Sequence, residues 1–161
     1  MTTQTWTAWP DNPLWSWQVT RIIGLVDFGA ANFAEIWEAV QRIRPRDEES
    51  WHQEWSRLGT LVESMAHEAE AAGNRLSARD SFSRAAQYFR LAHFFLPGDD
   101  ARKLPTLHRM ERCFKAGGRY FTPPNGADSL SEEVHFTTGR AAQEFGYNFL
   151  MFNAPGVGLR W

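Results

Sequence analysis

The stretch DEESWHQEWSRLGTLVESMAHEAEAAGN, residues 47–74, followed by RLSARDSFSRAAQYFRLAHFFL, residues 75–96, decides the fold. Asp47 is a good helix N-cap, and Glu48 and Glu49 favour the positive end of the helix dipole. Gly73-Asn74 is a typical C-terminal signal. Between them, apolar residues recur in steps of four and three: Trp51, Trp55, Leu58, Val62, Met65 and Ala69. The pattern predicts a long amphipathic helix.

A second helix is predicted to begin at Ser77 and to stop at Pro97-Gly98. One face carries Ala78, Phe82, Ala85, Phe89 and Ala92, and that face is widened by Tyr88, Leu91 and Phe95. The link between the two helices is short. Antiparallel packing follows, and the pair is expected to form an αα-hairpin whose second helix is central.

Shorter helices are predicted on either side of the hairpin. Phe33, Ile36, Trp37 and Val40 share one helical face before Pro45, and Leu107, Met110 and Phe114 share another between about 104 and 116. Residues 1–20 contain Trp6, Trp9, Trp15 and Trp17 at irregular spacing. We interpret residues 1–20 as an extended aromatic arm, which packs either on its own domain or on a partner.

The character of the sequence changes after residue 119. Ser129 and Glu132 form a capping box for a helix that is expected to run to Phe145. Residues 147–152 are strand-like, and a loop follows at 153–158. The predicted fold is mainly α, with a helical domain at 21–119 and a short helix–strand remnant of a parallel α/β core at 120–161.

Composition excludes several classes of protein. The 17 Lys+Arg against 19 Asp+Glu give no basic surface for nucleic acid. One cysteine rules out a disulfide framework, and no apolar run suits a membrane span. The N-terminus has no signal-peptide pattern, so a cytoplasmic location is expected. Aromatic residues make up 14% of the chain, which excludes disorder.

The residues reveal no catalytic group, metal site or cofactor site. No serine lies in a Gly-x-Ser-x-Gly nucleophile elbow. Cys113 lies on an apolar helix face, where burial makes a thiol inert. Glu63 and His67 lie four residues apart without a third ligand, so they are interpreted as a surface pair rather than a zinc site.

Two stretches together resemble a known family. They are residues 47–96 and GADSLSEEVHF (126–136) with GYNFLMFNAPGVG (146–158). Both are similar to the α/β hydrolases that include 2,6-dihydroxypseudooxynicotine hydrolase and the polyketide-shortening hydrolases of fungal pigment pathways. The resemblance implies a helical lid before a core with a Ser-His-Asp triad, which cleaves carbon–carbon or ester-like bonds beside carbonyls. It also implies that Gly126, Ala127 and Asp128 belong to the oxyanion loop.

The departures from this family matter for function. Tyr120-Phe121 and Gly126 are separated by too few residues for even one core strand and its turns, because a strand rises ~3.3 Å per residue. The chain also reaches Trp161 before the family's triad residues. We therefore interpret it as a truncated or internally deleted relative that is inactive alone, which leaves open whether it is an enzyme.

Two alternatives are non-enzymatic. Trp55-x-x-Leu58-Gly59 with Ala78, Phe82 and Ala85 matches one tetratricopeptide unit, so the chain could be a helical interaction module. Its partner would be a second copy or a full-length relative. The other alternative is a binder of aromatic small molecules that uses Trp51, Trp55, Tyr88 and Phe89, four residues that would equally suit a hydrophobic core.

Overall fold

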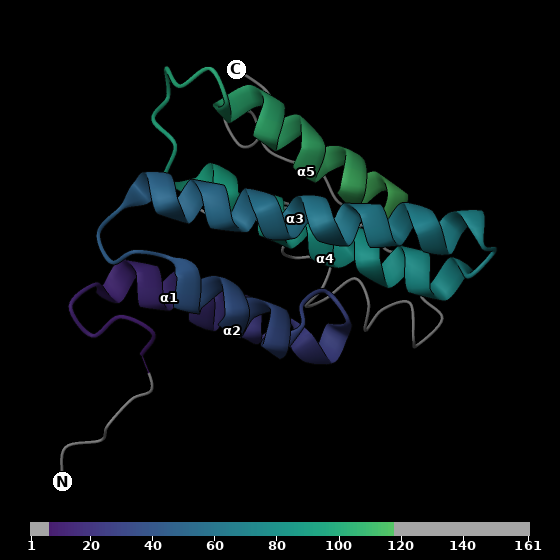
Figure 1. The fold of residues 1–161 in the computed structure, drawn as a ribbon, viewed down its shortest axis with the longest axis horizontal. Coiled ribbons are helices and arrows are strands. Elements are labelled where there is room, and N and C mark those ends of the chain that lie inside the picture. Colours follow the sequence, from purple (N-terminus) through teal and green to yellow (C-terminus); the bar gives the residue numbers. More distant parts are fainter. Residues whose placement is uncertain (1–6, 118–161) are drawn as a thin grey trace, which may run out of the picture.

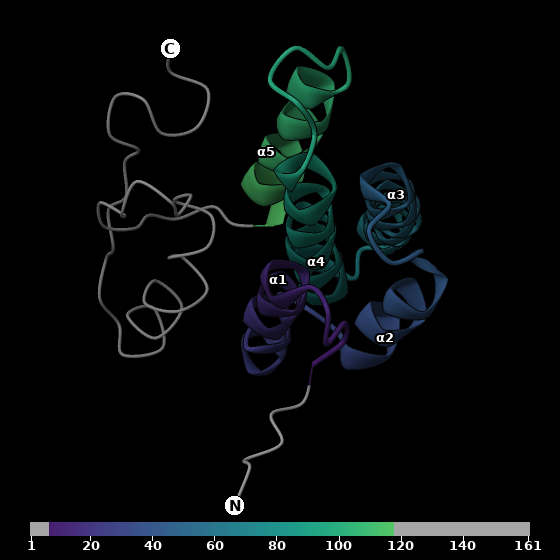
Figure 2. The same ribbon diagram turned by 90° about the vertical axis from the view of Figure 1, so that its left-hand side faces the viewer.

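The computed structural model describes residues 7–117, and this part of the chain is a bundle of helices (Figure 1). The elements in order are α1 (Pro13–Ile23), the short 3-10 helix η1 (Val26–Phe28), α2 (Phe33–Arg42), α3 (Glu48–Ala71), α4 (Arg75–Phe94) and α5 (Lys103–Gly117). Figures 1 and 2 show α1 and α2 on one side of the α3–α4 hairpin and α5 on the other. The mainly α fold is confirmed, and residues 7–117 contain no strand.

The ends of the hairpin helices follow local sequence signals. The Asp47 carboxylate accepts a hydrogen bond from the Ser50 backbone N–H at 2.9 Å, as expected of an N-cap. Gly73 has φ of +76°, a conformation that glycine adopts without strain. The second helix begins at Arg75, earlier than the predicted Ser77, and the Asn74 carbonyl accepts its first backbone hydrogen bond, from the Ala78 N–H at 2.9 Å.

The prediction of an extended arm at the N-terminus is wrong over residues 13–20. These residues belong to α1, in which Pro13 is the first helical residue and Asn12 accepts from the Trp15 backbone N–H at 3.2 Å. Proline favours this position because the first backbone N–H of a helix has no intrahelical partner. Trp9 and Trp15 are buried in the same core as α3, so this segment packs on its own domain.

The core lies mainly around α4. Between Ser81 and Ala92 only Arg84 is not fully buried, since α3, α5 and α1 surround this helix. The predicted central position of this helix is therefore confirmed. Most of the predicted face of α3 is buried as well, but Met65 is 44% exposed and Ala66 is buried in its place.

The predicted inward face of α2 is only partly correct. Ile36 and Val40 are buried together with Ala39, whereas Phe33 is 52% and Trp37 42% exposed. The rings of Phe33 and Trp37 stack on each other, with centroids 6.3 Å apart. The helical spacing is compatible with burial of either the aromatic side of α2 or its aliphatic side. Contact with α3 buries the aliphatic side.

No helix within residues 7–117 is long and apolar enough to cross a membrane. The predicted helix at 129–145, the strand at 147–152 and the loop at 153–158 lie outside the described residues.

Candidate functional site: the aromatic centre of the bundle

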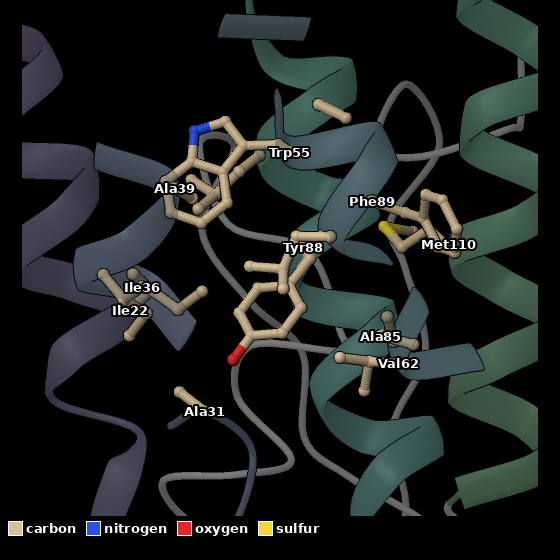
Figure 3. Close-up of a cluster of buried hydrophobic side chains, with 14 of the residues drawn as sticks. Ile22, Ala31, Ile36, Ala39, Trp55, Val62, Ala85, Tyr88, Phe89 and Met110 are labelled. Atoms are coloured by element: carbon tan, nitrogen blue, oxygen red, sulfur yellow. The ribbon is translucent and has the colours of Figure 1, made fainter. Parts of the chain in front are cut away.

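The four residues predicted as an aromatic pocket lie in the interior of the bundle. Trp51, Trp55, Tyr88 and Phe89 are each at most 1% exposed. Trp55 stacks on Tyr88 with ring centroids 6.0 Å apart, and Trp51 meets Trp55 edge-on at 5.7 Å. Figure 3 shows Trp55 and Tyr88 on one side of α4 and Phe89 beside Met110 on the other. The structure thus brings three of them together, and their burial favours the core interpretation.

The aromatic cluster continues to the N-terminal segment. Trp15 lies 4.9 Å from Trp51, and Trp9 contacts both rings at 5.5 and 5.8 Å. Phe95 closes the cluster at 5.1 Å from Trp51. Much of the aromatic content of the sequence is therefore used to join α1, α3 and the end of α4.

Side chains of α3 cap the C-terminus of α4. The Trp51 indole N–H donates to the Leu91 carbonyl at 2.6 Å, and His52 Nδ1 lies 2.9 Å from the Ala92 carbonyl. Carbonyls in the last turn of a helix have no intrahelical donor, so these contacts satisfy groups that would otherwise be buried unpaired. Sequence reasoning missed this role because the two partners are 40 residues apart in the chain.

Tyr88 also carries a polar link between α2 and α4. Its hydroxyl donates to Glu35 Oε2 at 2.6 Å and accepts from the Asn32 backbone N–H at 3.1 Å. Arg84 Nε lies 3.2 Å from the same carboxylate oxygen. Burial, together with the Glu35 charge, raises the pKa of Tyr88 above its usual value, so the hydroxyl stays a donor.

A third cluster corrects the predicted pairing of Glu63 with His67. Glu63 Oε2 instead pairs with Arg109 Nη2 of α5 at 2.5 Å, while His67 lies 3.7 Å from Glu70. The Arg109 guanidinium also lies 4.3 Å from the centroid of the Phe89 ring. Helical spacing placed Glu63 and His67 as neighbours, but Glu63 turns toward α5, which periodicity within one helix cannot indicate.

Cys113 belongs to the same cluster. Its thiol donates to Glu63 Oε1 at 3.4 Å. Burial, aided by the Glu63 charge, raises the pKa of Cys113 to about 12. The thiolate that a nucleophile needs is therefore strongly disfavoured, and the predicted burial of Cys113 is confirmed.

A buried polar contact links α1 to α4. Arg90 Nη1 donates to Gln18 Oε1 at 3.3 Å and Arg90 Nε donates to Gln87 Oε1 at 3.2 Å. All three side chains are at most 3% exposed. Sequence reasoning missed them as well, because nothing in the helical pattern of α4 marks Gln87 and Arg90 as interior positions.

These clusters hold helices together. Within residues 7–117, no group of three His, Cys, Asp or Glu side chains is arranged to hold a metal ion. The candidate oxyanion-loop residues Gly126, Ala127 and Asp128 lie outside the described part of the chain. The described geometry is that of helices joined by buried aromatic and polar contacts.

Comparison with known proteins supports the resemblance in the sequence. The chain is 29% identical over 183 residues to the alpha/beta hydrolase xenA of Xenoacremonium sinensis, a match that covers 91% of this chain and 43% of that protein. It is 28% identical to the alpha/beta hydrolase psoB of Aspergillus fumigatus, covering 92% and 43%, and 29% identical to gkaG of Penicillium citrinum, covering 94% and 45%. No protein-family model matches the sequence.

The predicted resemblance to α/β hydrolases is thereby confirmed across most of the sequence. The chain spans less than half the length of these relatives. The alignment with xenA spans 183 positions, which exceeds the 161 residues of this chain, so the relative contains residues without a counterpart here.

Proposed function

We propose that the helical domain, residues 21–119, is the lid of an α/β hydrolase and that residues 120–161 are a fragment of its core. The observation that carries this proposal is the match to hydrolases over about nine tenths of this chain. The described bundle supports this proposal because buried aromatic and polar contacts join its helices into one unit.

Under this proposal, the core strands that this chain lacks would lie between Phe121 and Gly126 in a complete hydrolase. The alignment with xenA has more positions than this chain has residues, and this supports an internal deletion. Gly126, Ala127 and Asp128 would then follow the first retained core segment, where a hydrolase loop offers a backbone N–H to the developing oxyanion.

The reaction proposed for the complete hydrolase is cleavage of a carbon–carbon or ester-like bond beside a carbonyl of an aromatic or polyketide substrate. The lid would exclude water and shape the substrate pocket above the triad. The 161 residues contain no Gly-x-Ser-x-Gly motif, so this chain alone should not form an acyl-enzyme.

The first test is hydrolysis of an aryl ester by the purified 161-residue chain, with heat-denatured protein as the control. We expect equal rates from both samples. Turnover above the control that a serine-directed fluorophosphonate abolishes would overturn the inactive assignment.

The second test addresses the lid itself. A triad-bearing relative whose own lid has been deleted is mixed with this chain, and ester hydrolysis is measured. Partial restoration of the relative's activity is expected, and the same mixture with denatured chain is the control. Failure to restore activity, despite binding of the two proteins, would contradict the lid assignment.

The aromatic-ligand alternative makes a separate prediction. Trp51 and Trp55 are buried at the centre of the bundle, so a ligand that enters there must change their fluorescence. A titration with a polyphenolic ketone that leaves the fluorescence unchanged at millimolar concentration would remove this alternative.

A further inference from the structure

One face of α4 carries polar side chains that are as deeply buried as the hydrophobic core. Ser83, Gln87 and Arg90 are at most 7% exposed, and their helical spacing places them in one stripe along the helix. The stripe is turned away from Tyr88, whose ring stacks on Trp55 of α3. Figure 2 shows α3 beside α4, and α1 and α5 at its other flanks. The stripe therefore lies on the side of α4 between α1 and α5.

The middle of this stripe is rich in hydrogen-bond donors. Arg90 Nε donates to Gln87 Oε1 at 3.2 Å, so the oxygen of the Gln87 amide faces Arg90 and its NH2 group does not. Within residues 7–117, Gln87 Nε2 has no hydrogen-bond partner, although the side chain is fully buried. A guanidinium has five N–H groups and accepts no hydrogen bond. Gln87 and Arg90, called here the donor cluster, therefore suit an oxygen acceptor, because a buried donor without one is destabilising.

A carboxylate fits this donor cluster better than a neutral carbonyl. It offers two acceptor oxygens, and its negative charge pairs with a guanidinium in a short, charge-assisted contact. A buried cation is costly unless a negative charge lies beside it. Gln18 of α1 provides an amide oxygen 3.3 Å from Arg90 Nη1, so the contact with α1 brings no negative charge.

The chain leaves the described bundle beside the same stripe. A Cβ at Gly117, the last residue of α5, would lie 2.7 Å from Ser83 Oγ and 2.9 Å from the Ser83 backbone nitrogen. Ser83 lies about one helical turn from Gln87. Residues 118–161 therefore start close to the donor cluster.

The segment after Gly117 supplies carboxylates within reach of the donor cluster. Its first three acidic residues are Asp128, Glu132 and Glu133. The stretch from Gly117 to Asp128 can extend to about 36 Å, whereas Ser83 and Arg90 are separated by only about 10 Å along the helix axis. The length of the segment thus permits any of these three carboxylates to contact Arg90.

We propose that the donor cluster binds a carboxylate of residues 128–133 and so attaches this segment to α4. The carboxylate accepts hydrogen bonds from Gln87 Nε2 and from the Arg90 guanidinium, on the side of α4 between α1 and α5. Gly126 and Ala127 directly precede this segment, so the contact holds the candidate oxyanion loop against the lid. This last consequence rests on the proposed function, whereas the attachment of the segment does not.

Double-mutant cycles in the full chain test the contact by urea denaturation. Arg90→Met is combined in turn with Asp128→Asn, Glu132→Gln and Glu133→Gln. The second change costs little once its partner has been removed, so one of the three pairs should be non-additive by about tenfold in the unfolding equilibrium constant.

A matched control for these cycles lies on another flank of α4. Arg84 Nε lies 3.2 Å from Glu35 Oε2, so Arg84→Met and Glu35→Gln should be non-additive. Arg84→Met should be additive with each change in residues 128–133. This comparison separates a specific contact of Arg90 from the general effect of removing an arginine from α4.

Gln87→Glu tests the proposal in a second way that keeps Arg90 in place. The introduced carboxylate lies where Arg90 Nε already donates, so it neutralises the guanidinium and repels the carboxylate of the segment. Hydrogen exchange followed by mass spectrometry should become about tenfold faster in peptides from residues 120–136, because the segment loses its attachment. Gln53→Glu is the same change at an exposed position of α3 and should leave this exchange unchanged.

Three results would each overturn the proposal. The first is additivity of Arg90→Met with all three carboxylate changes, and the second is unchanged exchange of residues 120–136 in Gln87→Glu. The third is stabilisation of the parent chain by millimolar benzoate that Arg90→Met abolishes and the carboxylate changes do not affect, since the donor cluster would then bind a small-molecule anion. None of these measurements requires hydrolysis, so they are independent of the lid-deletion experiment.

Discussion

The substitution Gly59→Ala tests the packing of the hairpin most sharply. Gly59 lies on α3, and a Cβ at this position would lie 2.8 Å from Cε1 and 3.0 Å from Cδ1 and Cζ of the Phe89 ring. Carbon atoms pack at about 3.5–4.0 Å, so the ring or the helix must move. Phe89 is 1% exposed and is contacted by Arg109, which leaves the ring little room.

Two opposing effects determine the magnitude. Overpacking of a buried site costs about 1–3 kcal/mol, and the constrained Phe89 ring favours the upper end. Replacing glycine by alanine inside a helix returns about 1 kcal/mol. The free energy of unfolding should therefore fall by about 1–2 kcal/mol. For a domain of this size, the melting temperature should fall by roughly 4–10 °C.

Urea denaturation followed by circular dichroism measures the change. Gly98→Ala is the control, since no atom lies within 4 Å of a Cβ at Gly98. In a Phe89→Leu background the clash is relieved, so Gly59→Ala should then stabilise the chain by about 0.5–1 kcal/mol. The close approach of Gly59 to the Phe89 ring would be refuted if Gly59→Ala, made in the chain that retains Phe89, caused no loss of stability.

The remaining predictions concern polar groups. Tyr88→Phe removes the bond to Glu35 and leaves the Asn32 N–H without its acceptor, so urea denaturation should show a loss of about 1–3 kcal/mol; unchanged stability would contradict the link between α2 and α4. Cys113, with its pKa raised to about 12, should react with a thiol reagent at pH 8 only at the rate of unfolding, and rapid labelling of folded protein would argue against its burial. Burial, with the nearby Lys103 and Arg90 charges, lowers the pKa of His93 from 6.5 to about 4. The unfolded chain then binds the proton first, so stability should fall as the pH drops from 6.5 to 4, and His93→Gln should flatten this part of the stability curve.

Much of the helical framework could be predicted because helix ends are local. The capping contact of Asp47 to Ser50 spans three residues, and Gly73 ends α3 through its own backbone conformation. Signals of this range are contained in the sequence around each end. The predicted extended arm is wrong over residues 13–20, because Asn12 and Pro13 begin a helix there while the irregular spacing of the tryptophans carries no helical period.

The candidate site could be predicted only in part. Trp51, Trp55 and Tyr88 were identified as a group because they repeat on the inner faces of two helices that pair. Phe89 was placed with them, although it faces α5. The partners of Glu63 and Tyr88 lie on other helices, at separations of 46 and 53 residues, and no pattern within a single helix connects them.

The sequence by itself determined the helical character of residues 33–117, the hairpin of α3 with α4 and the similarity to α/β hydrolases. Helix caps, apolar periodicity and sequence similarity can each be recognised from the order of residues alone. Only the tertiary structure decided which flank of each helix is buried. Phe33 and Trp37 lie on the exposed flank of α2 although they are its largest apolar residues, and Gln87 and Arg90 lie inside. Burial depends on which neighbours surround a helix, and for α4 those neighbours are α1, α3 and α5 together.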